Sequence, residues 1–114
     1  MPYQDKDPQT PGVGGKFEWK TTAISPGVQA LVGDDPIVSM TLTAFLRQHH
    51  SGLWGAVSAE EAAANEQALA DGSGLFSRHH LKGQEIWILT DAEPREVTNV
   101  MLPEEYDAPS TDGT

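Results

Sequence analysis

Histidine is the residue of this chain best suited to chemistry, and its four copies occur as two adjacent pairs, His49-His50 and His79-His80. An imidazole binds transition metals and exchanges protons near neutral pH. A metal site needs three or four converging ligands, and neighbours on a strand or helix point in different directions, so each pair offers at most one ligand. Carboxylates that would complete such a site are Glu66 and Glu85. Because no ligand spacing typical of a metal motif occurs, we expect no metal and no cofactor, and we interpret His49 as a core residue that ends a helix.

Hydroxyl and carboxylate groups give little support to a catalytic site. Ser77 lies two residues before His79, a spacing too common to indicate a nucleophile with its base. The sequence has no nucleophile elbow, phosphate-binding loop or dinucleotide fingerprint. The pair Glu104-Glu105 has the chemistry for acid–base catalysis, but its place after Pro103 fits a solvated charged turn better. We therefore predict no catalytic residues.

Several short clusters combine aromatic, amide and carboxylate side chains, as binding surfaces do. Each cluster also has a structural interpretation: Trp54 as a loop plug, Asn65 as a buried partner of the backbone, Trp87 as core, and Tyr106 as a cover over the sheet edge. The candidate binding residues are His49, Trp54, Asn65, Glu66, Trp87, Thr90 and Tyr106. We expect any site to lie where the loop after His49 meets the sheet.

The elements that position these residues follow from capping signals and hydrophobic period. Ser25-Pro26, Asp35-Pro36 and the capping box Ser58-x-x-Glu61 start three helices, which end near Gly33, His50 and Gly72. Alternating residues predict strands at 17–22, 75–81, 85–90 and 96–102, with turns at 82–83 and 91–94. The order β-α-α-α-β-β-β predicts an α+β domain over residues 16–106, with an antiparallel β-meander packed against two or three helices and the first strand at an edge. Residues 1–15 and 107–114 are predicted to be disordered tails.

The acidic charge is the strongest signal of the composition. The net charge is −10, and residues 16–106 hold 13 acids against 6 scattered bases. A phosphate backbone needs a basic face, so this charge argues against direct nucleic-acid binding. An acidic surface suits a basic protein partner or imitates a nucleic acid, and it also keeps a protein soluble. With no cysteine, no secretory signal and no long apolar stretch, we expect a cytoplasmic protein without a membrane span.

Five stretches in order resemble a family of small bacterial proteins of unknown function that are carried on plasmids, integrative elements and phages. The family pattern is T-P-G-A, F-L-x-R-H-x-x-G-D-W-G, N-E, I-W-I-I-T-E and L-L-P-E-E-Y. The matching stretches here are 25–28, 45–55, 65–66, 86–91 and 101–106. The matched positions are His49, Gly52, Trp54, Gly55, Asn65, Glu66, Trp87, Thr90, Thr98, Pro103 and Tyr106. Leu53 replaces the family Asp, His79 replaces a Tyr, and Pro94 is an extra residue in the second turn.

The resemblance and the charge together predict an acidic accessory protein of a mobile genetic element that binds another protein without catalysis. Counter-defence is one version, in which the acidic surface blocks a nucleic-acid groove. One alternative is a small hydrolase or nuclease with a site near His49, Asn65 and Glu66, which requires these residues and Thr90 to meet in one pocket. The other alternative is a structural homodimer, joined through a sheet edge or the alanine-rich helix.

Overall fold

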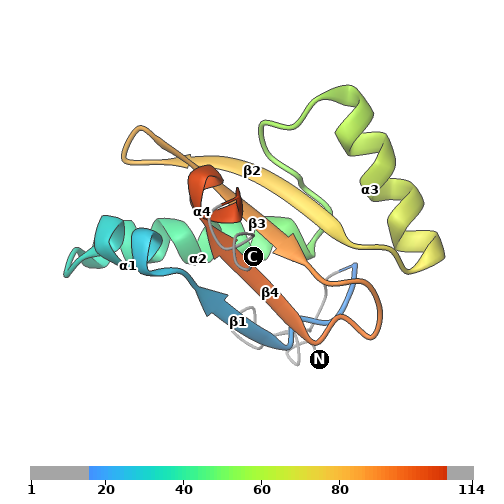
Figure 1. Ribbon diagram of the computed structural model, residues 1–114, viewed down its shortest axis with the longest axis horizontal. Coiled ribbons are helices and arrows are strands. Elements are labelled where there is room, and N and C mark those ends of the chain that lie inside the picture. The colour runs from blue at the N-terminus through green and yellow to red at the C-terminus, as the bar shows by residue number, and fades with distance from the viewer. Residues whose placement is uncertain (1–15, 108–114) are drawn as a thin grey trace, which may run out of the picture.

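The computed structural model describes residues 16–107, which form one four-stranded mixed sheet with four helices (Figure 1). The predicted α+β class is confirmed. The elements in chain order are β1 (Thr21–Ile24), α1 (Pro26–Val32), α2 (Pro36–His50), α3 (Ala59–Asp71), β2 (Leu75–Leu81), β3 (Gln84–Thr90), β4 (Val97–Met101) and α4 (Pro103–Asp107). The predicted tails at 1–15 and 108–114 lie outside the described residues, whereas Asp107, expected in the second tail, ends α4.

The sheet has the strand order β1-β4-β3-β2. Strands β2, β3 and β4 form the predicted antiparallel meander, and β1 joins its edge by pairing in parallel with β4, with Thr21 opposite Val97. The predicted first strand at 17–22 is wrong, because pairing starts only at Thr21. The alternating Phe17 and Trp19 pack instead on the His50 ring at the end of α2, with ring centroids 4.5 and 4.9 Å away.

The helices begin where the sequence places their caps. The side chain of Ser25 accepts a hydrogen bond from the Val28 N–H of α1, and that of Asp35 accepts one from the Ile37 N–H of α2. Ser58 and its capping-box partner start α3. These contacts satisfy backbone donors that a helix start leaves free, so the capping signals of the sequence are confirmed.

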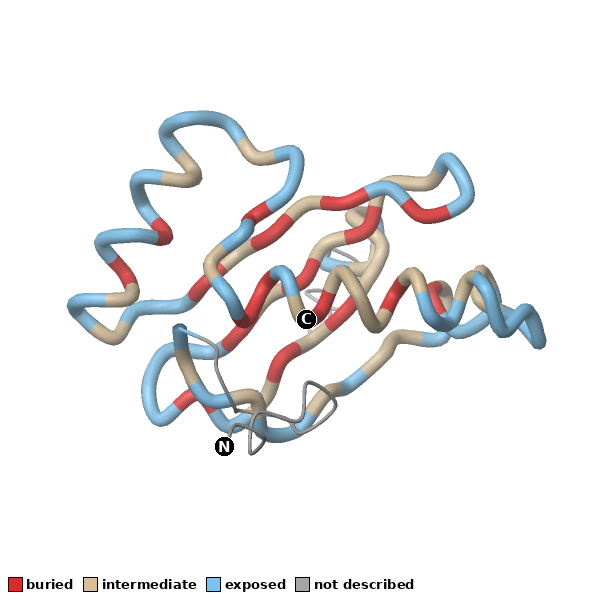
Figure 2. The backbone as a smooth tube through the Cα atoms, turned by 180° about the vertical axis from the view of Figure 1, so that it is seen from behind, coloured by how far each residue is buried: buried red, intermediate tan, exposed pale blue. Residues whose placement is uncertain are grey.

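The core lies between α2 and one face of the sheet. Leu42 and Leu46 of α2 belong to the same buried cluster as Ile86, Ile88 and Val100 of the central strands. Figure 2 shows α2 lying over this face, and its buried residues lie in its second half, from Leu42 to His50. Burial of apolar side chains on one stripe of a helix is the main force that holds such a layer together.

The sheet edge at β2 and the sheet face opposite α2 are covered to different extents. The alanine-rich α3 packs beside β2 at the edge of the sheet, where Ala68 joins Trp54 and Leu75 in a second buried cluster. Among residues 16–107, the short α4 is the helix that packs on the sheet face opposite α2, and it lies in front of the sheet in Figure 1. The sequence predicts no helix there, because five residues are too few to show a helical period.

Candidate functional site

A chain of buried polar side chains joins the end of α2 to three strands. His49 Nδ1 lies 2.5 Å from Ser77 Oγ, and His49 Nε2 lies 2.8 Å from Thr90 Oγ1. Thr90 Oγ1 continues to Thr98 Oγ1 at 2.8 Å, which lies 3.4 Å from His50 Nε2. We call these five residues the histidine–hydroxyl network. It satisfies both ring nitrogens of His49 and fixes the helix end to β2, β3 and β4.

The contact between Ser77 and His49 has the form of a nucleophile with its base, but its surroundings do not suit catalysis. Both residues are 0% exposed, so a substrate has no route to the hydroxyl. A catalytic base is usually oriented by a carboxylate that stabilises the imidazolium, whereas His49 has the neutral hydroxyl of Thr90. Burial, and to a lesser extent the neighbouring His50 and His79, hold the pKa of His49 well below 6.5. The network is therefore a neutral structural link.

The other buried histidines are packed against aromatic rings. His50 lies against Phe17 and Trp19, and burial lowers its pKa to about 4. His79 stacks on Phe45 with centroids 4.3 Å apart, and its pKa is lowered by burial and then by the adjacent His80. Within residues 16–107, no group of three or more His, Asp or Glu side chains is placed to hold a metal ion.

The loop after α2 and the side chain of Asn65 complete the outer edge of β2. Asn65 Nδ2 donates to the Phe76 carbonyl at 2.7 Å, and Asn65 Oδ1 accepts from the Phe76 N–H at 2.9 Å. Two residues further on, Arg78 N–H donates to the Trp54 carbonyl and the Arg78 carbonyl accepts from Ala56 N–H. An unpaired strand edge invites aggregation, so these contacts protect β2.

Trp54 ties this loop to both α2 and α3. Its ring is 6% exposed, contacts His49 edge-on at 5.7 Å, and donates through Nε1 to Glu66 Oε2 at 3.1 Å. The structure therefore brings five of the predicted residues close to the junction of loop and sheet, namely His49, Trp54, Asn65, Glu66 and Thr90. Their side chains face one another or the backbone.

Trp87 and Tyr106, the other two predicted residues, lie on the opposite face of the sheet. Trp87 contacts Tyr106 edge-on at 5.5 Å and donates through Nε1 to Glu85 at 2.7 Å. Tyr106 on α4 is 52% exposed. The predicted set therefore divides between the two faces. In the first group His49, Trp54, Asn65 and Thr90 are buried and Glu66 is exposed, and the second group lies on the opposite, more accessible face.

The sequence interpretation of Glu104-Glu105 as a solvated turn is wrong for Glu105. Its carboxylate accepts from Ser25 Oγ at 2.5 Å, from Gly27 N–H at 2.8 Å and from Leu102 N–H at 2.8 Å. Burial raises the pKa of Glu105, but these three hydrogen bonds outweigh it and the net shift is downward. We call this the Glu105 clasp, and it joins the end of the fold to the start of α1.

The sequence gives only weak signals for the other members of these contacts. The spacing of Ser77 from His79 is too common to single it out as a site residue. Thr98 is only a matched position of the family pattern, and His50 is only one member of a histidine pair. Alternate residues of a strand lie on the same face, so the spacing of Ser77 from Leu75 and His79 is the signal that places it in the core.

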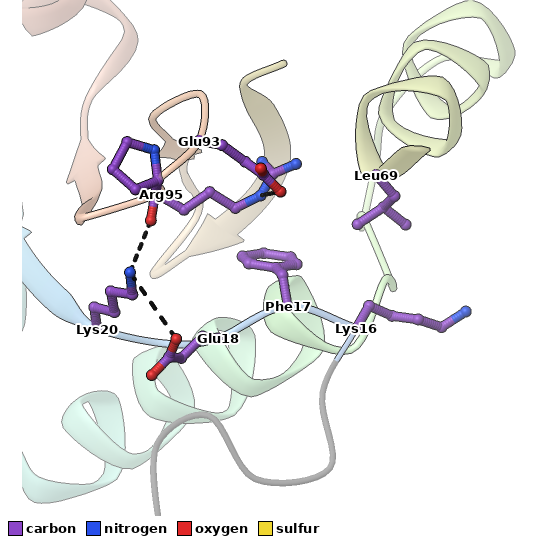
Figure 3. Close-up of a pocket in the computed structure, with 8 residues that line it drawn as sticks. Lys16, Phe17, Glu18, Lys20, Leu69, Glu93 and Arg95 are labelled. Carbon is purple, nitrogen blue, oxygen red and sulfur yellow. Dashed lines mark hydrogen bonds and ion pairs between the residues drawn. The ribbon is translucent and has the colours of Figure 1, made fainter. Parts of the chain in front are cut away.

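A mixed-charge pocket of about 370 Å³ lies between the segment before β1 and the turn before β4 (Figure 3). Three cations, Lys16, Lys20 and Arg95, line it together with the carboxylates of Glu18 and Glu93, and the side chains of Lys20 and Arg95 have partners in the fold. Lys20 donates to the Pro94 carbonyl and pairs with Glu18, and the buried Arg95 donates to the carbonyls of Ser73 and Ala68. The pocket is therefore no concentrated anion site.

The other two described pockets are an open groove of about 420 Å³ beside Tyr106 and a smaller hollow of about 290 Å³ between α1 and α2. His49, Asn65 and Glu66 line none of the three. Of the four residues that the enzyme alternative brings together, only Thr90 lines one of these three pockets, the groove beside Tyr106. The contacts among the other three are packing and hydrogen bonds within the fold.

Comparisons of the chain with protein-family models, with curated proteins and with solved structures find no match. Across the part of the chain that the structure describes, no helix has the length and apolar character needed to cross a bilayer. A functional assignment therefore rests on the residues described above.

Proposed function

We propose that this chain is a non-enzymatic protein-binding module that recognises a basic partner. The observation that carries this proposal is the enclosure of its reactive side chains. His49 and Ser77 are fully buried and engaged with each other, so the residues with catalytic chemistry serve the fold. Among the exposed charged side chains of the described residues, carboxylates outnumber cations.

The few bases of the fold leave this acidic surface largely unmatched. Arg78 is held between Glu61 and Glu85, each at 3.0 Å. Lys20 is engaged with neighbouring carboxylates and Arg95 is buried among backbone carbonyls. A surplus of exposed acids raises the rate of association with a basic surface and favours it over acidic competitors.

The mobile-element resemblance adds a more specific version of this function. An acidic module that occupies the nucleic-acid groove of a host restriction or CRISPR complex would protect an incoming element. The charge and the five sequence stretches support this version.

Affinity capture from a bacterial host lysate tests the proposal. The tagged full chain is expected to retain a basic protein at low salt and to release it as salt rises, because exposed charges are screened within about 10 Å at 0.1 M. The control is a variant with Asp34→Asn, Glu60→Gln, Asp91→Asn and Glu104→Gln, which neutralises exposed acids. Capture of no stable partner, or equal capture by this variant, would count against the function.

Light scattering tests the structural homodimer at the same time. A monomeric mass over a wide concentration range would remove that alternative. A stable dimer that retains no partner would favour it over the proposed function.

A further inference from the structure

The sheet face opposite α2 is an apolar surface with little cover. Phe76, Trp87, Leu89 and Met101 alternate with the buried core residues and are half-buried, since α4 is the one helix of the described part of the chain that packs on this face. Figure 1 shows this face toward the viewer, with α4 crossing part of it. We call these four residues, together with Tyr106, the open face.

A groove of about 420 Å³ runs into the open face beside α4. Phe76, Leu89, Met101 and Tyr106 line it with apolar and aromatic surface, and Asn99 contributes an amide. A groove of this kind accepts one or two apolar side chains, and the amide adds a hydrogen-bonding group that orients them.

The charged side chain that lines the groove is acidic. Asp91 lines it and is exposed. Arg78, a cation of the same face, is already paired with Glu61 and Glu85. An occupant of the groove therefore meets the Asp91 carboxylate, for which the described residues show no ion-pair partner.

We propose that the open face is the docking surface of this module, and that its occupant is a basic segment of another protein. One apolar side chain of that segment enters the groove, and a flanking Lys or Arg pairs with Asp91 at its rim. This inference rests on the proposed function and gives it a location. Under this inference Trp87 and Tyr106, which contact each other, together form and support one wall of the groove.

Charge favours a basic segment over two other candidate occupants of the groove, which are residues 108–114 and a second copy of the chain. Residues 108–114, which follow α4, contain one acid and no base, so they do not complement the rim. A second copy of the chain brings the same acidic rim and a net charge of −10, which disfavours a face-to-face dimer. A basic partner is the one that gains from both the apolar groove and its rim.

Selection of peptides from a phage-displayed random library on the full chain tests the surface. We expect enriched sequences to combine an apolar residue with Lys or Arg. A synthetic peptide of the enriched sequence should shift the amide resonances of Phe76, Leu89 and Met101 in the labelled chain. Asp91→Lys should weaken its affinity by about tenfold, because a rim charge is reversed. Asp34→Lys is the matched control, since Asp34 is equally an exposed aspartate but lies between α1 and α2.

Each other outcome overturns the inference in a recognisable way. Equal weakening by both variants means that binding follows net charge, which leaves the proposed function standing without this surface. Shifts confined to α2 or α3 place the partner elsewhere. Concentration-dependent shifts of the open face in the free chain identify a second copy, and nuclear Overhauser contacts from 108–114 to the Tyr106 ring identify the chain's own end. If no peptide is enriched and the lysate yields no partner, the proposed function fails as well.

Discussion

At the scale of single residues, His49 shows how a reactive side chain becomes a structural one. Its neutral ring donates at one nitrogen and accepts at the other, and the hydroxyls of Ser77 and Thr90 serve either role. Both tautomers are therefore satisfied without a charge. Burial then keeps the ring neutral by lowering its pKa, so His49 acts as a neutral partner of the two hydroxyls.

Replacement of His49 by Ala should reduce the free energy of unfolding by about 3 kcal/mol, because it opens a cavity and leaves two buried hydroxyls with fewer partners. Urea unfolding followed by tryptophan fluorescence measures this change. His80→Ala is the control, since His80 is exposed and should change stability by no more than about 0.5 kcal/mol. If the His49→Ala protein is as stable as the His80→Ala protein but no longer binds its protein partner, the His49 ring has a binding role instead.

The adjacent glutamates 104 and 105 should differ sharply when each is changed to Ala. Glu105→Ala removes the acceptor of three hydrogen bonds and should cost about 2 kcal/mol, whereas the exposed Glu104 should cost little. Chemical denaturation of the two variants makes the comparison. Equal stability of both variants would mean that the Glu105 clasp contributes nothing in solution.

At the scale of elements, β2 depends on a close approach by the loop that follows α2. Gly55 has φ +77°, and a Cβ atom there would collide with the Arg78 carbonyl and lie 2.7 Å from His79 Cε1. The loop therefore needs glycine both for its backbone conformation and for the space beside the strand.

Gly55→Ala and Gly83→Ala separate these two requirements. Gly83, in the β2–β3 turn, also has φ +77° but faces open space, so its substitution should cost only about 1 kcal/mol of backbone strain. Gly55→Ala carries the same strain together with the collision and should cost at least about 2 kcal/mol more. Thermal unfolding of both variants gives the difference, and equal losses would mean that the loop moves away from β2 without penalty.

The sequence predicts those parts of the fold that are coded locally. Caps at Ser25, Asp35 and Ser58 and the turn at 82–83 depend on neighbouring residues, and the structure confirms them. The range of β1 was wrong because the alternation of Phe17 and Trp19 reflects packing on His50, and period alone does not tell packing from strand pairing. The parallel pairing of β1 with β4 joins residues far apart in the chain and has no local signal.

The candidate site was predictable in the same limited way. Trp87 and Thr90 are separated by an odd number of positions on β3, so their appearance on opposite faces follows from strand period alone. The joining of His49 to Ser77 depends on how α2 crosses the sheet. The role of Glu105 depends on its distant partners Ser25 and Gly27.

At the scale of the whole molecule, acid should destabilise the fold before its carboxylates are protonated. The pKa values of His49, His50 and His79 are all lowered from 6.5 by burial. Below pH 6.5 the unfolded chain therefore binds protons that the folded chain excludes, and stability is full above this pH and falls as pH drops toward about 4, the pKa of His50. Each histidine contributes up to about 1.4 kcal/mol per pH unit in this window.

Unfolding by urea at about pH 7.5, 6 and 5 should show this decline in the free energy of unfolding. Glu61, Asp71 and Glu105 have lowered pKa values, so they add a further loss only at more acidic pH, below their ordinary values of 4.5 and 3.8. A flat profile between about pH 7.5 and 5 would contradict the burial of the three rings.

The Glu105 clasp has a consequence for how the chain is made on the ribosome. Ser25 is synthesised early, but the carboxylate that holds it follows 80 residues later, and the partner strand of β1 begins only at Val97. The growing chain can therefore form α2 and the β2–β3 hairpin before β4 is present to pair with β1. Translation arrested shortly before Val97 would release a product with an unpaired β1, a ready substrate for quality-control proteases.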